Sequence, residues 1–286
     1  DEGLMDLDAG TVLLQWATGG LFFLWITTRH RLLGIGYGWL LRGTYALMAV
    51  GAVWVGQRTD PYLPRDAAAV GVALAASFAF LVSYLRRKAG VARQRELVEA
   101  RTARVAEMTG IDRTERLAEG DGPEFPPALD LIAPIIGFVG LVFAGAHVGD
   151  PALLSVARTI TGALFLGAVT DAMLLGHWYL VQPGLPRDPI RELVKWTAAI
   201  WPVELLVLLW PVGMVSALNG TIDDGWDGLL SWFWLACTVT TIGLIGVTWA
   251  ALKEKEYSAV MAATGLLYLA ILTAFGMDLV ARAILA

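Results

Sequence analysis

The chain has 286 residues, of which 57% are hydrophobic, 16% are charged and twelve are tryptophan. Soluble domains average roughly 45–50% apolar and about 25% charged residues. With a mean hydropathy of +0.62, this composition excludes an ordinary soluble enzyme and a disordered scaffold. A net charge of −5 also argues against a nucleic-acid partner, which favours a basic face. The charges lie between long apolar stretches, as in a polytopic membrane protein whose partner is the lipid bilayer.

Eight apolar stretches are long enough to cross a bilayer, which takes about 20 helical residues. They cover residues 10–28, 33–56, 67–85, 129–148, 152–181, 194–218, 227–251 and 257–284. We therefore expect an all-α integral membrane protein, a bundle of about eight transmembrane helices. Residues 1–85 hold helices 1–3, and residues 129–286 hold helices 4–8.

The basic residues indicate the orientation. Sixteen of the 21 lie on the side of the membrane that the chain reaches after its first span. The positive-inside rule places that side in the cytoplasm, so both termini are expected outside. The predicted location is a bacterial cytoplasmic membrane.

Residues 86–128 form the single long connection between spans, a predicted cytoplasmic arm. A charged helix with an apolar stripe is expected from Arg93 to Met108. A turn-rich linker follows from Gly120 to Pro127. The arm is either a solvated extension or a docking surface for other protein subunits or lipid headgroups.

Small residues predict where helices approach each other. Gly34 and Gly38 are four residues apart, the spacing that allows close helix contact. Gly162 and Gly167 are five apart and fit that pattern less well.

Charged residues inside spans need a partner or a task, because the bilayer interior solvates them poorly. Arg42, Asp171 and Glu204 are each nine residues from the cytoplasmic end of their span, about 14 Å inward. This spacing predicts one buried cluster from three helices, either a proton-active site or a structural ion pair. Pro202 and Pro211 flank Glu204 and are expected to kink its helix.

A further pair of charges is predicted in the last span. Asp278 and Arg282 are four residues apart, one helical turn, and are expected to pair with each other.

Histidines and aromatic residues gather at the expected cytoplasmic rim. His30 and His177 come from two spans and could hold one haem b as axial ligands. His177, Trp178 and Tyr179 precede a proline-rich loop and could bind a quinone headgroup. The alternative is an aromatic belt at the membrane interface. No metal site is expected, because Cys237 is the single cysteine and no ligand spacing is present.

Three functions remain open on this sequence. The first is a membrane-anchoring, quinone-interacting subunit of a larger redox or energy-converting complex. The second is a proton-coupled transporter or channel subunit that uses Asp171 and Glu204. The third is a non-catalytic membrane scaffold or assembly subunit. No catalytic nucleophile set is visible, so a subunit of a membrane complex is favoured over a stand-alone enzyme.

Overall fold

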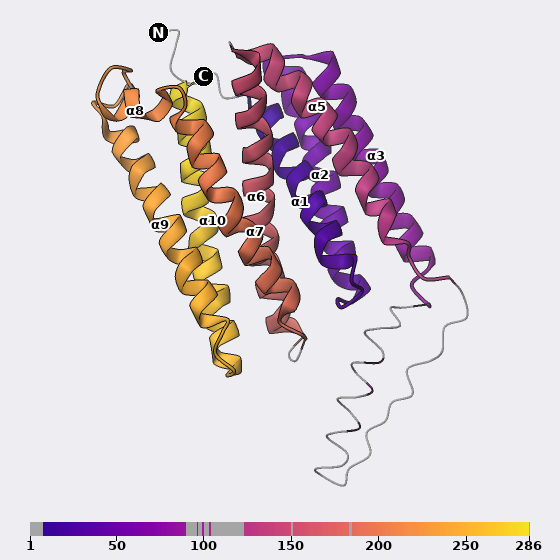
Figure 1. Cartoon of the computed structure of the whole chain (residues 1–286). Helices are drawn as coiled ribbons and strands as arrows, with labels where there is room; N and C mark the ends of the chain where they lie inside the picture. The colour runs from indigo at the N-terminus through magenta and orange to yellow at the C-terminus, as the bar shows by residue number, and fades with distance from the viewer. Residues whose placement is uncertain are drawn as a thin grey trace.

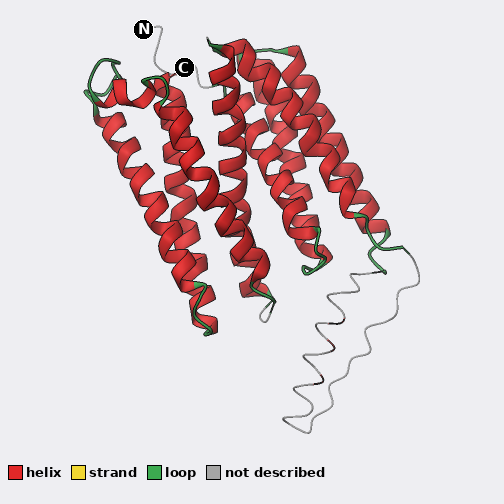
Figure 2. Ribbon diagram, viewed as in Figure 1, coloured by secondary structure: helices red, strands yellow, loops and turns green. Residues whose placement is uncertain are grey.

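The computed structural model describes residues 8–89, 123–149, 151–182 and 185–285, with 96, 99 and 103 as single residues. Within this part of the chain every regular element is helical (Figure 2). Of the predicted arm helix, only those three single residues are described. The elements are α1 (Ala9–Thr28), α2 (Ile35–Thr59), α3 (Leu63–Leu85), the 3₁₀ helix η1 (Pro127–Leu131), α5 (Ile132–Val148), α6 (Ala152–Val181), α7 (Asp188–Leu209), α8 (Gly213–Leu218), α9 (Leu229–Ala251) and α10 (Tyr257–Leu285).

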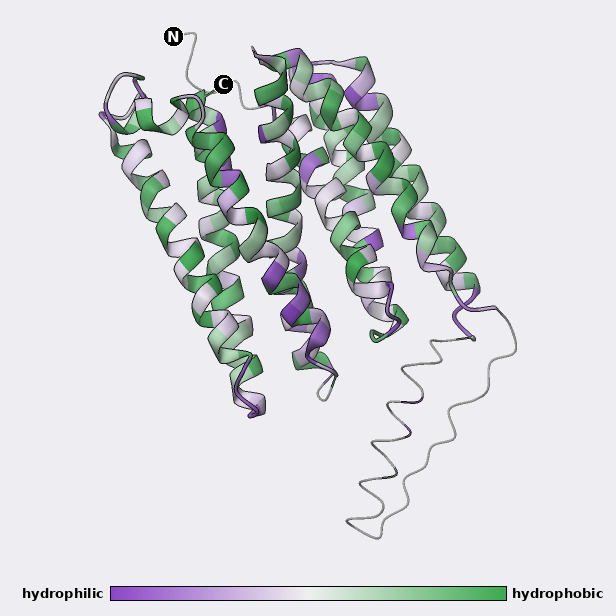
Figure 3. Cartoon of the chain, viewed as in Figure 1, coloured by the Kyte–Doolittle hydropathy of each residue, from purple (hydrophilic) through white to green (hydrophobic). Residues whose placement is uncertain are grey.

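Seven helical segments in the described residues are long and apolar enough to cross a membrane. They are α1, α2, α3, η1 with α5, α6, α9 and α10. Apolar residues cover the sides of the bundle (Figure 3), and large side chains such as Leu47, Leu74 and Leu272 point outward, with 73%, 67% and 69% of their surface exposed. The bundle is therefore built to present apolar surface to lipid, and the predicted membrane class is confirmed.

Helix α7 departs from the expected span at residues 194–218. It begins at Asp188, and its first two turns carry charged side chains, so it is not among the seven apolar spans of the described residues. Pro202 lies inside α7, as expected. The helix ends at Leu209, so the prediction that Pro211 lies in the same helix is wrong. A proline disfavours helical backbone at the preceding residue, and Trp210 is extended, with φ −88° and ψ 145°.

The helices form two groups around α6 (Figure 1). On one side α1 and α5 pack against α6, with α2 and α3 packed against α1 and α5; on the other side α7 and α10 pack against α6, with α9 against α10. The start of α1 and the end of α10 lie at one end of the bundle, here called the terminal end (Figure 1). The start of α7 and the end of α9 lie at the opposite end, here called the arm end.

The closest helix contact joins α1 to α6. A Cβ atom placed on Gly19 would lie 1.8 Å from the carbonyl oxygen of Ala163, and one on Gly167 would lie 2.2 Å from the carbonyl carbon of Gly19. Both are contacts with backbone, which cannot move aside. Gly19 and Gly167 therefore determine how closely α1 and α6 approach each other. The five-residue spacing between Gly162 and Gly167 did not predict this contact.

Other glycines make room for polar side chains instead of for a helix. A Cβ on Gly20 would meet the ring of Tyr45 at 2.0 Å. At Gly38 it would meet the guanidinium of Arg42 at 2.6 Å, so the expected helix contact at Gly38 is wrong. These positions give buried polar groups a place beside the helix backbone.

The loop before α9 is organised by Asp224. Its buried carboxylate accepts hydrogen bonds from the backbone N–H groups of Trp226 (3.0 Å), Gly228 (2.8 Å) and Ser231 (2.9 Å). It also accepts the Ser231 hydroxyl at 2.9 Å. These donors stabilise the charged form and lower the pKa of Asp224 to about 2.

Replacing Gly167 with alanine should destabilise the protein, because the new methyl group meets the backbone of α1. We expect a loss of about 1–3 kcal/mol, measured by unfolding in mixed micelles of increasing SDS content. Gly243→Ala is the matched control, since nothing lies within 4 Å of a Cβ at that position. Equal stability of the two variants would contradict the close contact.

The Asp224 loop should make stability depend on pH. A carboxyl group whose pKa is lowered on folding stabilises the protein above its unfolded pKa of about 3.9, and this contribution is lost as pH falls through about 2. Asp224→Asn should remove that part of the acid dependence. The measurement is the thermal midpoint from about pH 5 to pH 2 for both proteins; curves that stay parallel would show that Asp224 contributes nothing.

Candidate functional site

Arg42 forms a buried ion pair at the arm end. Its Nε and Nη2 atoms donate to the two carboxylate oxygens of Asp130, both at 2.7 Å, and both side chains are almost fully buried. The ring of Phe125 lies 4.3 Å from the Arg42 guanidinium carbon. The pair therefore joins α2 to η1, with each charge satisfied.

Asp171 lies on α6 and contacts a different helix. Its Oδ1 atom accepts a hydrogen bond from the hydroxyl of Tyr45 on α2. Its Oδ2 atom is buried and has no hydrogen-bond partner. The side chain is fully buried, so Asp171 is a carboxyl group with half of its hydrogen-bonding capacity unused.

Glu204 lies on α7 and is also fully buried. Neither of its carboxylate oxygens makes a hydrogen bond. Asp278, Arg282 and Thr161 are the polar groups close enough to interact with it. Glu204 is thus a buried acid that forms no ion pair with an arginine, although Thr161 and Asp278 lie close to it.

The structure does not bring Arg42, Asp171 and Glu204 into one cluster. Glu204 is five residues before the end of α7, about 8 Å from the terminal end. Asp171 is ten residues before the end of α6, about 15 Å from the arm end. The prediction assumed that the three residues lie at one depth because each is nine residues from the end of its span. This fails for Glu204, because α7 begins at Asp188, six residues earlier than the predicted span.

The partners of Glu204 come from α10. Arg282 binds Asp278 through two hydrogen bonds, Nε to Oδ2 at 2.9 Å and Nη2 to Oδ1 at 3.0 Å, so the predicted pair is confirmed. Gly162 on α6 makes room for it, because a Cβ there would lie 2.3 Å from Arg282 Nη2 and 2.5 Å from Asp278 Oδ1.

A second arginine, Arg158 on α6, holds the end of α7. Its guanidinium donates to the carbonyl oxygens of Val207 (3.0 Å) and Trp210 (2.8 Å). These carbonyls belong to the last turn of α7, which has no further helical donors. We call Arg158, Glu204, Asp278 and Arg282 the charge centre.

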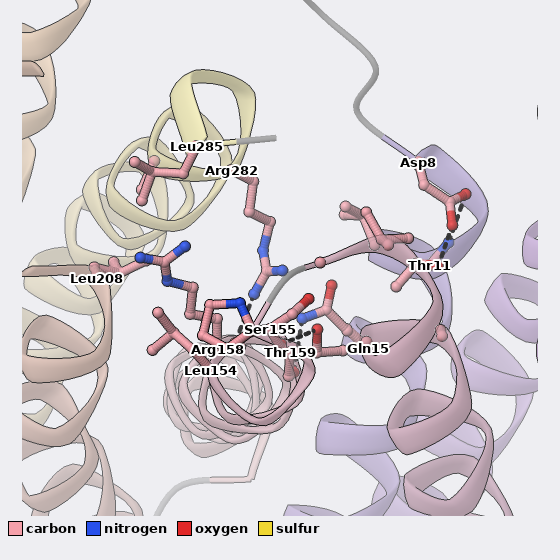
Figure 4. A pocket seen from close by; sticks show the side chains of 17 residues that line it. Asp8, Thr11, Gln15, Leu154, Ser155, Arg158, Thr159, Leu208, Arg282 and Leu285 are labelled. Atoms are coloured by element: carbon pink, nitrogen blue, oxygen red, sulfur yellow. Dashed lines mark hydrogen bonds between the residues drawn. The ribbon is translucent and has the colours of Figure 1, made fainter. Parts of the chain in front are cut away.

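The charge centre borders a pocket of about 320 Å³ at the terminal end, here called the terminal pocket (Figure 4). Arg158 and Arg282 line it together with Gln15, Ser155, Thr159 and Leu208. The Gln15 amide donates to the carbonyl oxygen of Thr159 at 2.8 Å, which ties α1 to α6. The pocket therefore offers two guanidinium groups, the Asp8 carboxylate, which pairs with Arg65, and several neutral polar groups beside apolar wall residues.

The histidines and aromatic residues of the rim have other partners. His177 is exposed and shares a hydrogen bond of 3.0 Å between its Nδ1 atom and the hydroxyl of Tyr268 on α10. Trp178 Nε1 donates to Gln182 Oε1 at 3.2 Å, and the Tyr179 hydroxyl donates to the carbonyl of Pro186. These polar atoms therefore join α6 to α10, to its own C-terminal residue and to the loop that follows it.

His30 is likewise engaged beside its own helix. Its Nε2 atom accepts a hydrogen bond of 3.0 Å from Arg29 Nε, and its side chain is exposed. His30 and His177 therefore have separate contacts, one next to α1 and one with α10.

Asp130 and Tyr45 are polar partners that sequence reasoning did not identify. Asp130 falls at the start of an expected span, directly after two prolines, where an acid looked like a boundary residue. Tyr45 lies three residues beyond Arg42 in the same predicted span, where an uncharged aromatic side chain does not indicate a buried hydrogen bond. An unpaired arginine in the second span was the one available signal that an acid elsewhere must meet it.

No group of three or more His, Cys, Asp or Glu side chains in the described residues could hold a metal ion. Comparison of the chain with known protein families, with curated proteins and with solved structures gives no match in any of the three. Function must therefore be argued from the charge centre and the terminal pocket.

Removing one partner of the Arg42–Asp130 pair should leave a buried charge without compensation. Asp130→Asn is expected to cost about 3–5 kcal/mol, measured by SDS-induced unfolding. Asp60→Asn, at an exposed position, is the control and should be neutral.

The double variant Arg42→Met with Asp130→Leu tests the cause of that loss. It removes both charges, so most of the lost stability should return. A double variant less stable than Asp130→Asn would show that the shape of the pair matters more than its charge.

Proposed function

We propose that this chain is a proton-coupled transporter or channel subunit in which Glu204 takes up and releases the proton. The observation that carries the proposal is a fully buried glutamate whose two oxygens are unpartnered, next to an ion pair that borders a pocket. A buried carboxyl group in this position has no fixed donor to hold it in the charged state. It can therefore exchange a proton when its surroundings change.

Charge balance in the centre supports a coupled process. Two arginines and two carboxylates give a neutral centre when Glu204 is ionised, and a net charge of +1 when it is protonated. Two of the four groups, Arg158 and Arg282, also line the terminal pocket. An anion that enters this pocket would compensate the added charge, so binding of a proton and of an anion would favour each other.

The arrangement also supports eight crossings. Helix α7 has 22 residues, about 33 Å, and it contacts α6 and α9, which are both long apolar helices. With α7 as the eighth crossing, the start of α1 and the end of α10 fall on one side, as they do in Figure 1. The basic residues of the connections then place the terminal end outside and the arm end in the cytoplasm.

Binding of quinone or one haem b near His177 and His30 stays a prediction of the sequence. Both histidines make hydrogen bonds within the protein, whereas the buried carboxylate oxygens without a hydrogen bond lie on Glu204 and Asp171. The geometry therefore favours the proton-coupled reading over the redox one.

The test is an infrared difference spectrum of the reconstituted protein between acid and alkaline pH. Every protonated carboxyl group has a carbonyl stretch that a carboxylate lacks, and a buried carboxyl group without hydrogen bonds has it at a higher frequency than exposed acids do. Wild type should therefore show a titrating band on the high-frequency side of the bands of the exposed acids. Glu204→Gln should lose this band, because glutamine keeps the shape and cannot ionise. Glu254→Gln, at an exposed position near the arm end, should keep it.

A functional readout accompanies the spectrum. Liposomes with an enclosed pH-sensitive dye should report proton movement with wild type and with Glu254→Gln, and not with Glu204→Gln. A Glu204→Gln protein that keeps both the band and the proton movement would refute the proposal.

A further inference from the structure

A second polar site lies at the arm end, away from the charge centre. A groove of about 850 Å³ runs between the first turns of α7 and the end of α9. Arg191, Lys195 and Trp196 line it from α7, and Trp249 and Lys253 line it from α9 and the residues after it. We call it the lysine–tryptophan groove.

Two lysines of the groove share one aromatic ring. The ammonium group of Lys195 lies 5.3 Å from the centre of the Trp249 ring, and that of Lys253 lies 5.8 Å from it. Neither lysine forms an ion pair with a carboxylate in the described part of the chain. Two like charges are thus held around one ring, where an anion between them would relieve their repulsion.

The other charged groups of the groove have partners of their own. Arg191 donates from Nε and Nη2 to the carbonyl oxygen of Leu252, at 3.2 and 2.6 Å, and so fixes the end of α9. Glu192 forms an ion pair with Arg29, the residue that directly follows α1. Asp188 lies in the first turn of α7, where an acid is stabilised by the helix N-terminus.

The surroundings of the groove match a phospholipid. Trp249 lies in the last turn of α9, the level at which tryptophan meets lipid headgroups, and Trp196 lines the same groove from the third turn of α7. Below the lysines, the same face of α7 continues with Ala199, Val203 and Leu206, which are exposed. Their spacing of four and three residues makes one apolar stripe along the helix.

We infer that the lysine–tryptophan groove binds the headgroup of an anionic phospholipid. Lys195 and Lys253 contact the phosphate, and an acyl chain lies along Val203 and Leu206. The two lysines supply compact charges suited to phosphate, and the tryptophans hold the headgroup at the interface. This site does not depend on the proposed role of Glu204.

The experiment compares thermal unfolding of the detergent-purified protein with added dioleoyl-phosphatidylglycerol or dioleoyl-phosphatidylcholine. Phosphatidylglycerol should raise the midpoint of wild type more than phosphatidylcholine does, because a ligand of the folded state stabilises it. The double variant Lys195→Gln with Lys253→Gln should lose this difference. Lys255→Gln, an exposed lysine two residues beyond the groove, should keep it.

Native mass spectrometry gives a readout that does not depend on stability. Wild type and Lys255→Gln should retain bound phosphatidylglycerol. Each single groove variant should lose part of it, and the double variant should lose more. If the double variant does not fold, the two single variants decide the result. Equal retention by wild type and the groove variants would overturn the inference.

A free anion is the other source of the same chemistry. Inorganic phosphate, added at the concentration of the lipid, should leave the midpoint unchanged, because it has no chain to lie along α7. A shift with phosphate equal to the shift with phosphatidylglycerol would overturn the assignment to a lipid.

Discussion

A charge placed among hydrocarbon chains needs a partner inside the protein, since neither water nor lipid tails can solvate it. Three arginines with little exposed side-chain surface meet this constraint. Arg42 binds Asp130, Arg65 binds Asp8 and Asp66, and Arg282 binds Asp278. Each guanidinium occupies space beside a glycine: Gly38, Gly56 and Gly162 would each place a Cβ within 2.6 Å of an arginine atom. The ion pairs and the glycines therefore depend on each other. A glycine in a helix leaves the space that an arginine of the same or a neighbouring helix occupies when it binds its acid.

The same constraint explains why Glu204 stands apart. Asp130 and Asp278 are held by two hydrogen bonds from one guanidinium each, so their charged forms are fixed by geometry. Arg282 is already committed to Asp278, and Arg158 is committed to the carbonyls at the end of α7. Glu204 lies within the field of both arginines and is bound by neither. Glu204 and Asp171 are therefore the two buried acids that no arginine binds, in an interior where Asp130 and Asp278 are closely paired.

The sequence alone was enough for the class of protein and for most of the helices, because long apolar stretches have no other stable location. It was also enough for Asp278 and Arg282, since partners one turn apart are set by helix geometry. It could not predict the partner of Arg42, because Asp130 is 88 residues away and meets it only through the packing of η1 against α1. Counting depth along spans also failed for Glu204, because a helix with charged first turns begins earlier than its apolar part suggests. The glycine spacing misled for a related reason. Gly38 has the spacing of a helix contact but accommodates the Arg42 side chain, whereas Gly167 lacks that spacing and meets the backbone of α1.

Helix α7 connects the two polar sites of the described chain. Its first turns face the lysine–tryptophan groove, and its last turns carry Glu204. It is the long helix that is not among the seven apolar spans of the described residues. Its charged residues line the groove or belong to the charge centre. Arginine–carbonyl contacts involve both of its ends, from Arg191 to Leu252 and from Arg158 to Val207 and Trp210. Between them, Pro202 removes one backbone donor two residues before Glu204. The acid therefore lies next to the point where the helix is least constrained by its own hydrogen bonds, while the contacts at its ends hold both sites in place.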